Sequence, residues 1–145
     1  MKIVLITLLI IFTLLVVYRQ ISYSQLSPAV REKERQVATA LTQRGLSPSY
    51  ILISGYRPPW LNRLMPLSAR KSVHQQGQAI DLFIFDINRD DRWNRADTDL
   101  MARLLDSLDR KHPDTRGGVG LYYGHLFSKR MVHFDVSGRH RHWNY

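Results

Sequence analysis

The chain has 145 residues, 44% of them apolar, with 21 lysines and arginines against 12 acidic residues, a formal net charge of +9 and no cysteine. The length suits one domain, and the apolar content excludes a disordered chain. The lack of cysteine excludes a disulfide scaffold, an iron–sulfur cluster, a thiolate zinc site and a cysteine nucleophile. A basic surface favours polyanionic partners: nucleic acid, anionic lipid or an acidic polymer such as a cell wall.

The N-terminal segment is strongly apolar, because residues 3–17 contain only Thr7 and Thr13 as polar residues. Such a run is typical of a signal-peptide core or a short membrane anchor. Its end lacks the small residues of a cleavage site, which favours an uncleaved anchor over a cleaved signal. A buried core helix is a weaker alternative, because the run has no polar face. We expect residues 1–18 to be a signal anchor or signal peptide. Residues 3–18 would then hold an exported, periplasmic or cell-envelope protein in the inner membrane.

The rest of the chain mixes helices and strands without regular alternation. Residues 19–27 are expected to form a polar tether and residues 28–145 the domain. The patterns predict a helix capped by Ser27, a helix capped by Asp97 or Thr98, and strands at 50–54, 79–85 and 131–136. The glycines at 117, 118, 120 and 124 are expected to mark turns, and residues 139–145 a basic, aromatic tail. We therefore expect an α+β fold, a small antiparallel sheet with flanking helices.

Residues 72–81 carry the most informative polar pattern. His74 and Asp81 are seven residues apart, too far to share a ligand in a straight strand or helix, but Gln76-Gly77 supplies a turn that can fold the chain back. Asp81 interrupts an apolar run, and burying a lone carboxylate is costly. A cation is therefore expected beside it. The pattern leaves open whether this is an arginine or a metal ion.

A second polar pattern lies in residues 132–136. Strand alternation places His133 and Asp135 on one face, opposite three apolar residues. This is what a metal-binding wall of a cleft needs. An ordinary half-buried strand with a hydrated polar face is the alternative.

These motifs together resemble a known family. Ser54-Gly55-Tyr56-Arg57-Pro58, then Ser72-x-His74-x-x-Gly77-x-Ala79-x-Asp81, then His133-Phe134-Asp135 are similar to the zinc D-alanyl-D-alanine carboxypeptidase and endopeptidase family. That family shares its fold with the hedgehog signalling domain. The run at 117–120 and the Arg139-x-x-x-Trp143 tail resemble its short periplasmic murein endopeptidase branch. The resemblance covers about residues 28–145 and implies a hedgehog/DD-peptidase-like fold.

The resemblance implies roles for individual residues. His74, Asp81 and His133 would be the three zinc ligands of a catalytic site that keeps an open position for water. Arg57 matches the family arginine that stabilises a developing oxyanion or holds a substrate carboxylate. Ser72 would fix the His74 loop.

One position departs from the family pattern. Many members carry an acidic general base three residues before the last histidine ligand, where this chain has Arg130. Arginine does not accept a proton. Asp135 is the first candidate for the base, with an equal alternative role as the partner that orients a ligand histidine. His125, His140 and His142 are weaker candidates.

Three functions follow, in decreasing order of expectation. The first is a zinc-dependent murein peptidase, a hydrolase that cleaves amide bonds in peptidoglycan stem peptides or cross-links, with endopeptidase favoured over D,D-carboxypeptidase activity. The second is a zinc-containing, catalytically inactive peptidoglycan-binding module. The third, a nucleic-acid binder, is disfavoured because the hydrophobic leader indicates export.

Overall fold

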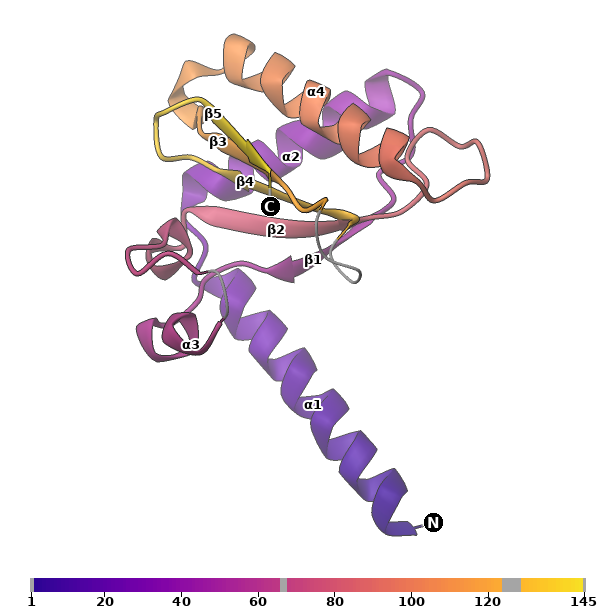
Figure 1. Ribbon diagram of the computed structural model, residues 1–145, viewed down its shortest axis with the longest axis vertical. Helices are drawn as coiled ribbons and strands as arrows, with labels where there is room; N and C mark the ends of the chain where they lie inside the picture. Colours follow the sequence, from indigo (N-terminus) through magenta and orange to yellow (C-terminus); the bar gives the residue numbers. More distant parts are fainter. Residues whose placement is uncertain (1, 66–67, 124–128, 145) are drawn as a thin grey trace.

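In the computed structural model, which describes residues 2–65, 68–123 and 129–144, the chain forms an α+β domain with an N-terminal helix projecting from it (Figure 1). That helix, α1 (Lys2–Ser24), is long and apolar enough to act as a membrane anchor or a signal sequence. Its apolar side chains are exposed, and only Ser22 is buried. The helix continues through most of residues 19–27, where the sequence predicts a tether.

The domain is built on a five-stranded sheet with the order β1-β2-β4-β3-β5. The strands are β1 (Tyr50–Ser54), β2 (Ala79–Ile84), β3 (Gly118–Leu121), β4 (Met131–Asp135) and β5 (Arg141–Asn144). The first three pairings along this order are antiparallel, but β3 and β5 are parallel. The prediction of an antiparallel sheet is therefore wrong, because the sheet is mixed.

The parallel pairing follows from how the chain leaves β4. The end of β4 lies beside the start of β3, since these strands are antiparallel. After β4, a short turn carries the chain past the start of β3. In this turn the Gly138 N–H donates to the Arg116 carbonyl at 2.9 Å. The next strand therefore begins level with Gly118 and runs in the direction of β3.

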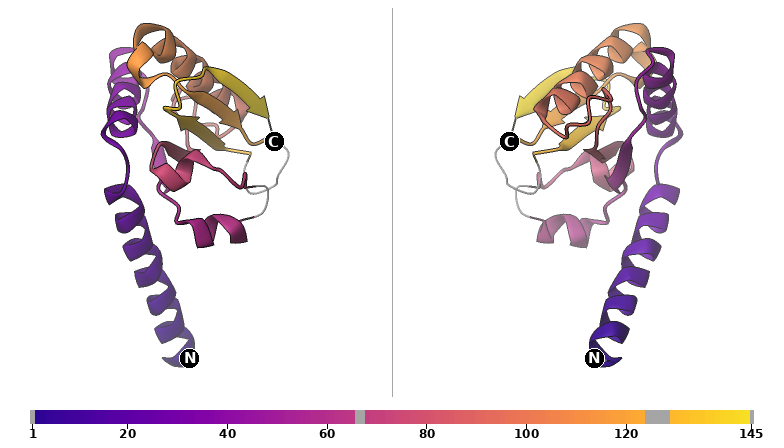
Figure 2. Two further views of the ribbon diagram at one scale, coloured as in Figure 1. Left: turned by 90° about the vertical axis from the view of Figure 1, so that its left-hand side faces the viewer. Right: turned by 90° about the vertical axis from the view of Figure 1, so that its right-hand side faces the viewer.

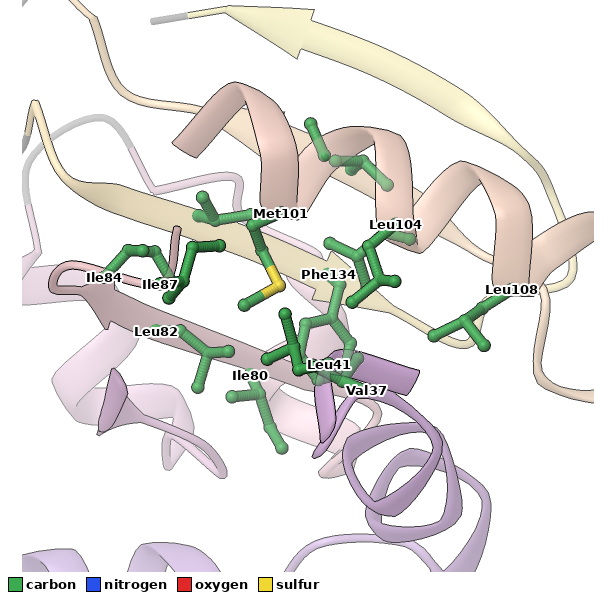
Figure 3. Close-up of a cluster of buried hydrophobic side chains, with 14 of the residues drawn as sticks. Val37, Leu41, Ile80, Leu82, Ile84, Ile87, Met101, Leu104, Leu108 and Phe134 are labelled. Atoms are coloured by element: carbon green, nitrogen blue, oxygen red, sulfur yellow. The ribbon is translucent and has the colours of Figure 1, made fainter. Parts of the chain in front are cut away.

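Two helices, α2 (Pro28–Gln43) and α4 (Arg95–Lys111), cover one face of the sheet (Figures 1 and 2). The core lies between them and strands β2 and β4, and Figure 3 shows side chains from all four elements meeting there. Its fully buried members include Val37, Leu41, Ile80, Leu82, Met101, Leu104 and Phe134. Burial of this apolar area is the main stabilising contribution to the fold.

The residues that cap the N-termini of α2 and α4 agree only in part with the sequence prediction. Ser27 caps α2 as predicted, accepting a hydrogen bond from the Val30 N–H. The cap of α4 is Asn94 instead of Asp97 or Thr98, because Asn94 and Asp97 form a reciprocal capping box. Asp97 is therefore the third helical residue.

Three short helices complete the described part of the fold: α3 (Pro59–Leu64), η1 (Val73–Gln76) and η2 (Pro113–Thr115). Alternation along β2 and β4 sends Ile80, Leu82 and Phe134 toward the helices. Asp81 and His133 therefore belong to the opposite face of the sheet, beside η1.

Candidate metal centre

Asp81 and His133 are register partners on the neighbouring strands β2 and β4. The two residues are 2% and 5% exposed, and Asp81 Oδ1 lies 2.9 Å from His133 Nδ1. Residues directly opposite each other on one face of an antiparallel pair have adjacent Cβ atoms. The sheet register itself therefore brings this carboxylate and this imidazole together.

His74 reaches the same point from the 3-10 helix η1. Ser72 caps η1 by accepting a hydrogen bond from the His74 N–H at 3.3 Å, and Gly77 ends it with a φ of 64°. This is the turn that the Gln76-Gly77 pair predicts. It places His74 Nε2 at 3.3 Å from Asp81 Oδ2 and 3.2 Å from His133 Nδ1.

The donor set fits a metal ion. His74 Nδ1 lies 2.7 Å from the Gly55 carbonyl, so a neutral ring donates there and presents the Nε2 lone pair to the cluster. His133 Nε2 lies 3.5 Å from Asp135 Oδ2, so a neutral ring that carries its proton on Nε2 presents the Nδ1 lone pair beside Asp81. Two lone pairs and a carboxylate thus converge within 4.8 Å of one another, in a buried setting that requires a cation. Two histidines and one carboxylate are a common ligand set of catalytic zinc.

The charges within the cluster act on each other. Burial alone would raise the pKa of Asp81, but the adjacent His74 and His133 outweigh it and hold that pKa far below its usual range. Burial alone would lower the pKa of His133, and contacts with Asp135 and Asp81 raise it instead. Asp81 is therefore an ionised ligand candidate at neutral pH.

Arg57 is a second cation beside Asp81. Its guanidinium is buried, with Nη2 3.2 Å from Asp81 Oδ2 and 3.2 Å from Ser54 Oγ, and Nη1 3.2 Å from Ser68 Oγ. The Arg57 N–H also donates to the His74 carbonyl at 3.0 Å. Of the two cations considered for Asp81, the arginine is therefore present, and the two imidazoles form with Asp81 a group that could hold a metal ion.

Asp135 lies behind His133 and is fully buried. Its Oδ1 accepts from the Gly118 and Ser137 N–H groups at 2.8 and 2.9 Å, and its Oδ2 lies 3.5 Å from both His133 Nε2 and Arg141 Nη2. Burial would raise the pKa of Asp135, but its contacts with His133 and these N–H groups bring it well below the usual value. This geometry favours orientation of the His133 ring over proton abstraction.

Trp143 of β5 covers the cluster, a feature that the sequence reasoning missed. Its ring centroid lies 5.1 Å from that of His133. A Cβ at Gly118 or Gly120 would lie 2.5 and 2.6 Å from the indole, so only glycine fits at these two strand positions. The expectation that these glycines mark turns is wrong. The spacing of the two glycines was the sequence signal for this arrangement, because residues two apart in a strand lie on the same face and two glycines there leave room for an aromatic ring.

The end of α1 supports the loop that holds His74. Ser22 Oγ accepts from the Gly55 N–H at 3.1 Å and donates to the Tyr56 carbonyl at 2.8 Å. The Tyr56 N–H in turn donates to the Ser22 carbonyl at 3.2 Å. The same loop supplies the Gly55 carbonyl and the guanidinium of Arg57, so the N-terminal helix is continuous with the scaffold of the centre.

The weaker base candidates lie elsewhere. His125 falls outside the described residues. His140 and His142 contact Asp106 of α4, on the face of the sheet opposite His133. Arg130 lines a cavity of about 340 Å³ whose other lining residues are Trp93, Asn94, Arg95, Tyr123 and Lys129. That cavity is cationic and aromatic, and no carboxylate lines it among the described residues.

Comparisons of the chain with protein-family models, with curated proteins and with solved structures found no match.

Proposed function

We propose that the chain is a zinc-dependent murein peptidase of the zinc D-alanyl-D-alanine carboxypeptidase and endopeptidase family, with its hedgehog/DD-peptidase-like fold. The observation that carries the proposal is the convergence of His74, Asp81 and His133 within 4.8 Å, in a buried site beside Arg57. The family resemblance implies these same three residues as zinc ligands, and they come from three separate segments of the chain. Such a coincidence of motif and geometry supports the family assignment.

The three converging side chains would hold the zinc ion. When bound, zinc polarises a scissile carbonyl and lowers the pKa of a water molecule to about 7. With zinc bound, His74 and His133 would present neutral imidazole lone pairs, with the Gly55 carbonyl and the Asp135 carboxylate beside their other ring nitrogens. Groups that contact the outer nitrogen of a ligand histidine keep the ring in place and maintain metal affinity.

Arg57 is proposed to stabilise negative charge on the reacting amide oxygen or to hold a substrate carboxylate. Its guanidinium is already oriented by Ser54 and Ser68, so no ordering is needed when charge develops. It also neutralises Asp81, because its Nη2 lies 3.2 Å from the same carboxylate oxygen, Oδ2, that lies 3.3 Å from His74 Nε2. Removing Arg57 would therefore affect both the reaction and the charge balance of the site.

The proposed substrate is peptidoglycan, with endopeptidase favoured over D,D-carboxypeptidase activity. Its stem peptides carry free carboxylates, which suit a chain of net charge +9. Arg130, Lys129 and Arg95 in the 340 Å³ cavity are suitable partners for those carboxylates. No nucleic-acid partner is proposed.

The proposed location is the periplasmic side of the inner membrane, with residues 3–18 as an uncleaved anchor. Ser22 is 1% exposed and holds the Gly55 and Tyr56 backbone. Cleavage after residue 18 would leave this supporting segment without the rest of its helix. The close fit of the end of α1 to the domain supports retention of the leader.

A zinc-containing peptidoglycan-binding module is the second candidate. One observation favours it: both oxygens of Asp135 face N–H groups or cationic side chains, and Arg130 stands where the family base is found. Within the part of the chain that the structure describes, Asp81 and Asp135 are the carboxylates of the centre, and both are engaged. A protein of this kind would bind peptidoglycan without turnover.

The test uses the full-length chain in detergent, loaded with Zn²⁺ and incubated with defined muropeptides. Cleavage that is lost in His74→Ala supports the peptidase. Binding without cleavage, with zinc present, supports the binding module. Absence of zinc from the wild-type protein, or equal cleavage by wild type and His74→Ala, contradicts both. Fragment masses identify the bond that is cleaved.

A further inference from the structure

A second cluster of histidine and aspartate lies on the opposite side of the sheet. Asp106 of α4 faces His140, which immediately precedes the edge strand β5, and His142, which lies within it. One ligand atom from each of the three residues lies within 4.8 Å of the other two. His142 is level with Val119, whose side chain belongs to the core on the helix side, so this cluster is separate from the centre at His133.

The orientation of His140 directs its second ring nitrogen toward Asp106. Its Nδ1 lies 2.9 Å from Asp109 Oδ2, so a neutral ring donates its proton there. Its Nε2 then presents a lone pair toward Asp106 Oδ1 at 3.7 Å. A lone pair and a carboxylate oxygen that face each other repel unless a proton or a metal ion lies between them.

Asp109 is fixed independently of the histidines. The buried Lys33 ammonium lies 2.6 Å from Asp109 Oδ1 and also donates to the Asp135 carbonyl at 3.0 Å. The Gly117 N–H donates to Asp109 Oδ2 at 3.2 Å. Asp109 therefore acts as a preset partner for His140, in the carboxylate–histidine arrangement that supports metal ligation.

His142 supplies the second imidazole. Its Nε2 lies 2.6 Å from Asp106 Oδ1, and its ring centroid lies 5.1 Å from that of His140. The side chains of His140 and His142 are 40% and 43% exposed, and that of Asp106 is 24% exposed. An ion can therefore reach the cluster from solvent without opening the fold.

We infer that Asp106, His140 and His142 form a second divalent-metal site, which fastens the edge strand β5 to helix α4. Two imidazoles and one carboxylate suit a first-row transition ion such as Zn²⁺, and do not suit Ca²⁺ or Mg²⁺, which prefer oxygen ligands. Because β5 carries Trp143, whose ring contacts His133, a metal ion here also secures the cover of the first centre. The site does not depend on the proposed peptidase function.

The test counts Zn²⁺ bound to the metal-free full-length chain in detergent, by titration and by elemental analysis after desalting. His142→Ala and Asp106→Asn should each lose one equivalent relative to wild type. His112→Ala is the matched control, because this histidine is exposed at the end of α4 and lies outside the cluster. It should lose none. Unchanged binding in His142→Ala overturns the inference.

The His74→Ala/His133→Ala double variant separates this site from the first. It should retain the equivalent that His142→Ala removes. If wild type binds one equivalent that is lost in His142→Ala and kept in His133→Ala, the second site stands and the first fails. If the only equivalent is lost in His133→Ala and kept in His142→Ala, the first stands and the second fails.

Amide hydrogen exchange tests whether the ion fastens the strand. Zn²⁺ should slow exchange at residues 141–144 in wild type and not in His142→Ala. Metal binding with unchanged exchange in β5 would contradict the fastening role. Slower exchange in both proteins would show that the effect comes from elsewhere, and would contradict it as well.

Discussion

Asp135 holds His133 from behind: its Oδ2 lies 3.5 Å from His133 Nε2, while the other ring nitrogen faces Asp81. Its Oδ1 is occupied by the Gly118 and Ser137 N–H groups. A carboxylate so engaged is suited to orient the His133 ring. It is poorly placed to accept a proton from a water molecule.

Asp135→Asn distinguishes these two roles. The amide oxygen can keep both backbone N–H bonds, so the fold should survive, but the negative charge beside His133 is lost. An orienting role predicts that zinc affinity falls by about 10- to 100-fold, with activity falling in parallel. Metal-competition titration measures the affinity. Full zinc affinity with activity abolished would identify Asp135 as the base.

Arg57→Lys tests the proposed role of the guanidinium. Lysine keeps a positive charge near Asp81 but cannot reproduce the separate contacts with Ser54 and Ser68. We expect muropeptide cleavage to fall by about 10²- to 10³-fold with zinc content unchanged. Arg63→Lys, at an exposed position of α3, is the control and should retain activity. Equal activities of the two variants would remove Arg57 from the mechanism.

Ser22→Ala tests the coupling of α1 to the site loop. The change leaves the Gly55 N–H and the Tyr56 carbonyl without a buried partner, which costs about 1–3 kcal/mol of unfolding free energy. Ser24→Ala is the matched control, because Ser24 is exposed and its hydroxyl donates to the Ile21 carbonyl of its own helix. Its effect should stay within about 0.5 kcal/mol. Denaturant unfolding in detergent measures both, and equal stabilities would contradict the coupling.

Tyr50 predicts a pH dependence of stability. Burial and the neighbouring Glu34 raise its pKa from 10.0 to about 12. Above pH 10 the unfolded chain releases this proton while the folded chain keeps it, so the contribution of Tyr50 to stability is lost as the pH rises from about 10 to 12. The loss amounts to about 2–3 kcal/mol.

Tyr50→Phe is the reference for this effect. Phenylalanine has no proton to release, so the difference in unfolding free energy between wild type and variant should change over this pH range. Denaturant unfolding at pH 9 and at pH 12 measures it. A constant difference would show that Tyr50 does not titrate differently in the folded and unfolded chains.

The local patterns predicted the parts of the fold that depend on near neighbours. Alternation in residues 132–136 correctly placed His133 and Asp135 on one face, and Ser27-Pro28 marked the start of α2. The turn at Gly77 followed from the need to fold His74 back toward β2. These features depend on side-chain periodicity and backbone conformation, which a short segment carries by itself.

Other features of the fold depend on tertiary contacts and could not be predicted from the sequence. Gly118 and Gly120 form a strand because Trp143 lies flat against them, a contact between residues more than 20 positions apart. The parallel β3–β5 pairing depends on the path of the chain around the start of β3. The burial of Ser22 depends on the loop at Gly55, and no property of α1 alone predicts it.

The most direct test of the first centre is the zinc content of the purified full-length chain compared with His133→Ala, with His112→Ala as the matched control. The proposed site predicts that His133→Ala binds about one zinc ion fewer per chain than wild type, and that His112→Ala binds the same number. Equal zinc content in wild type and His133→Ala would contradict the central claim.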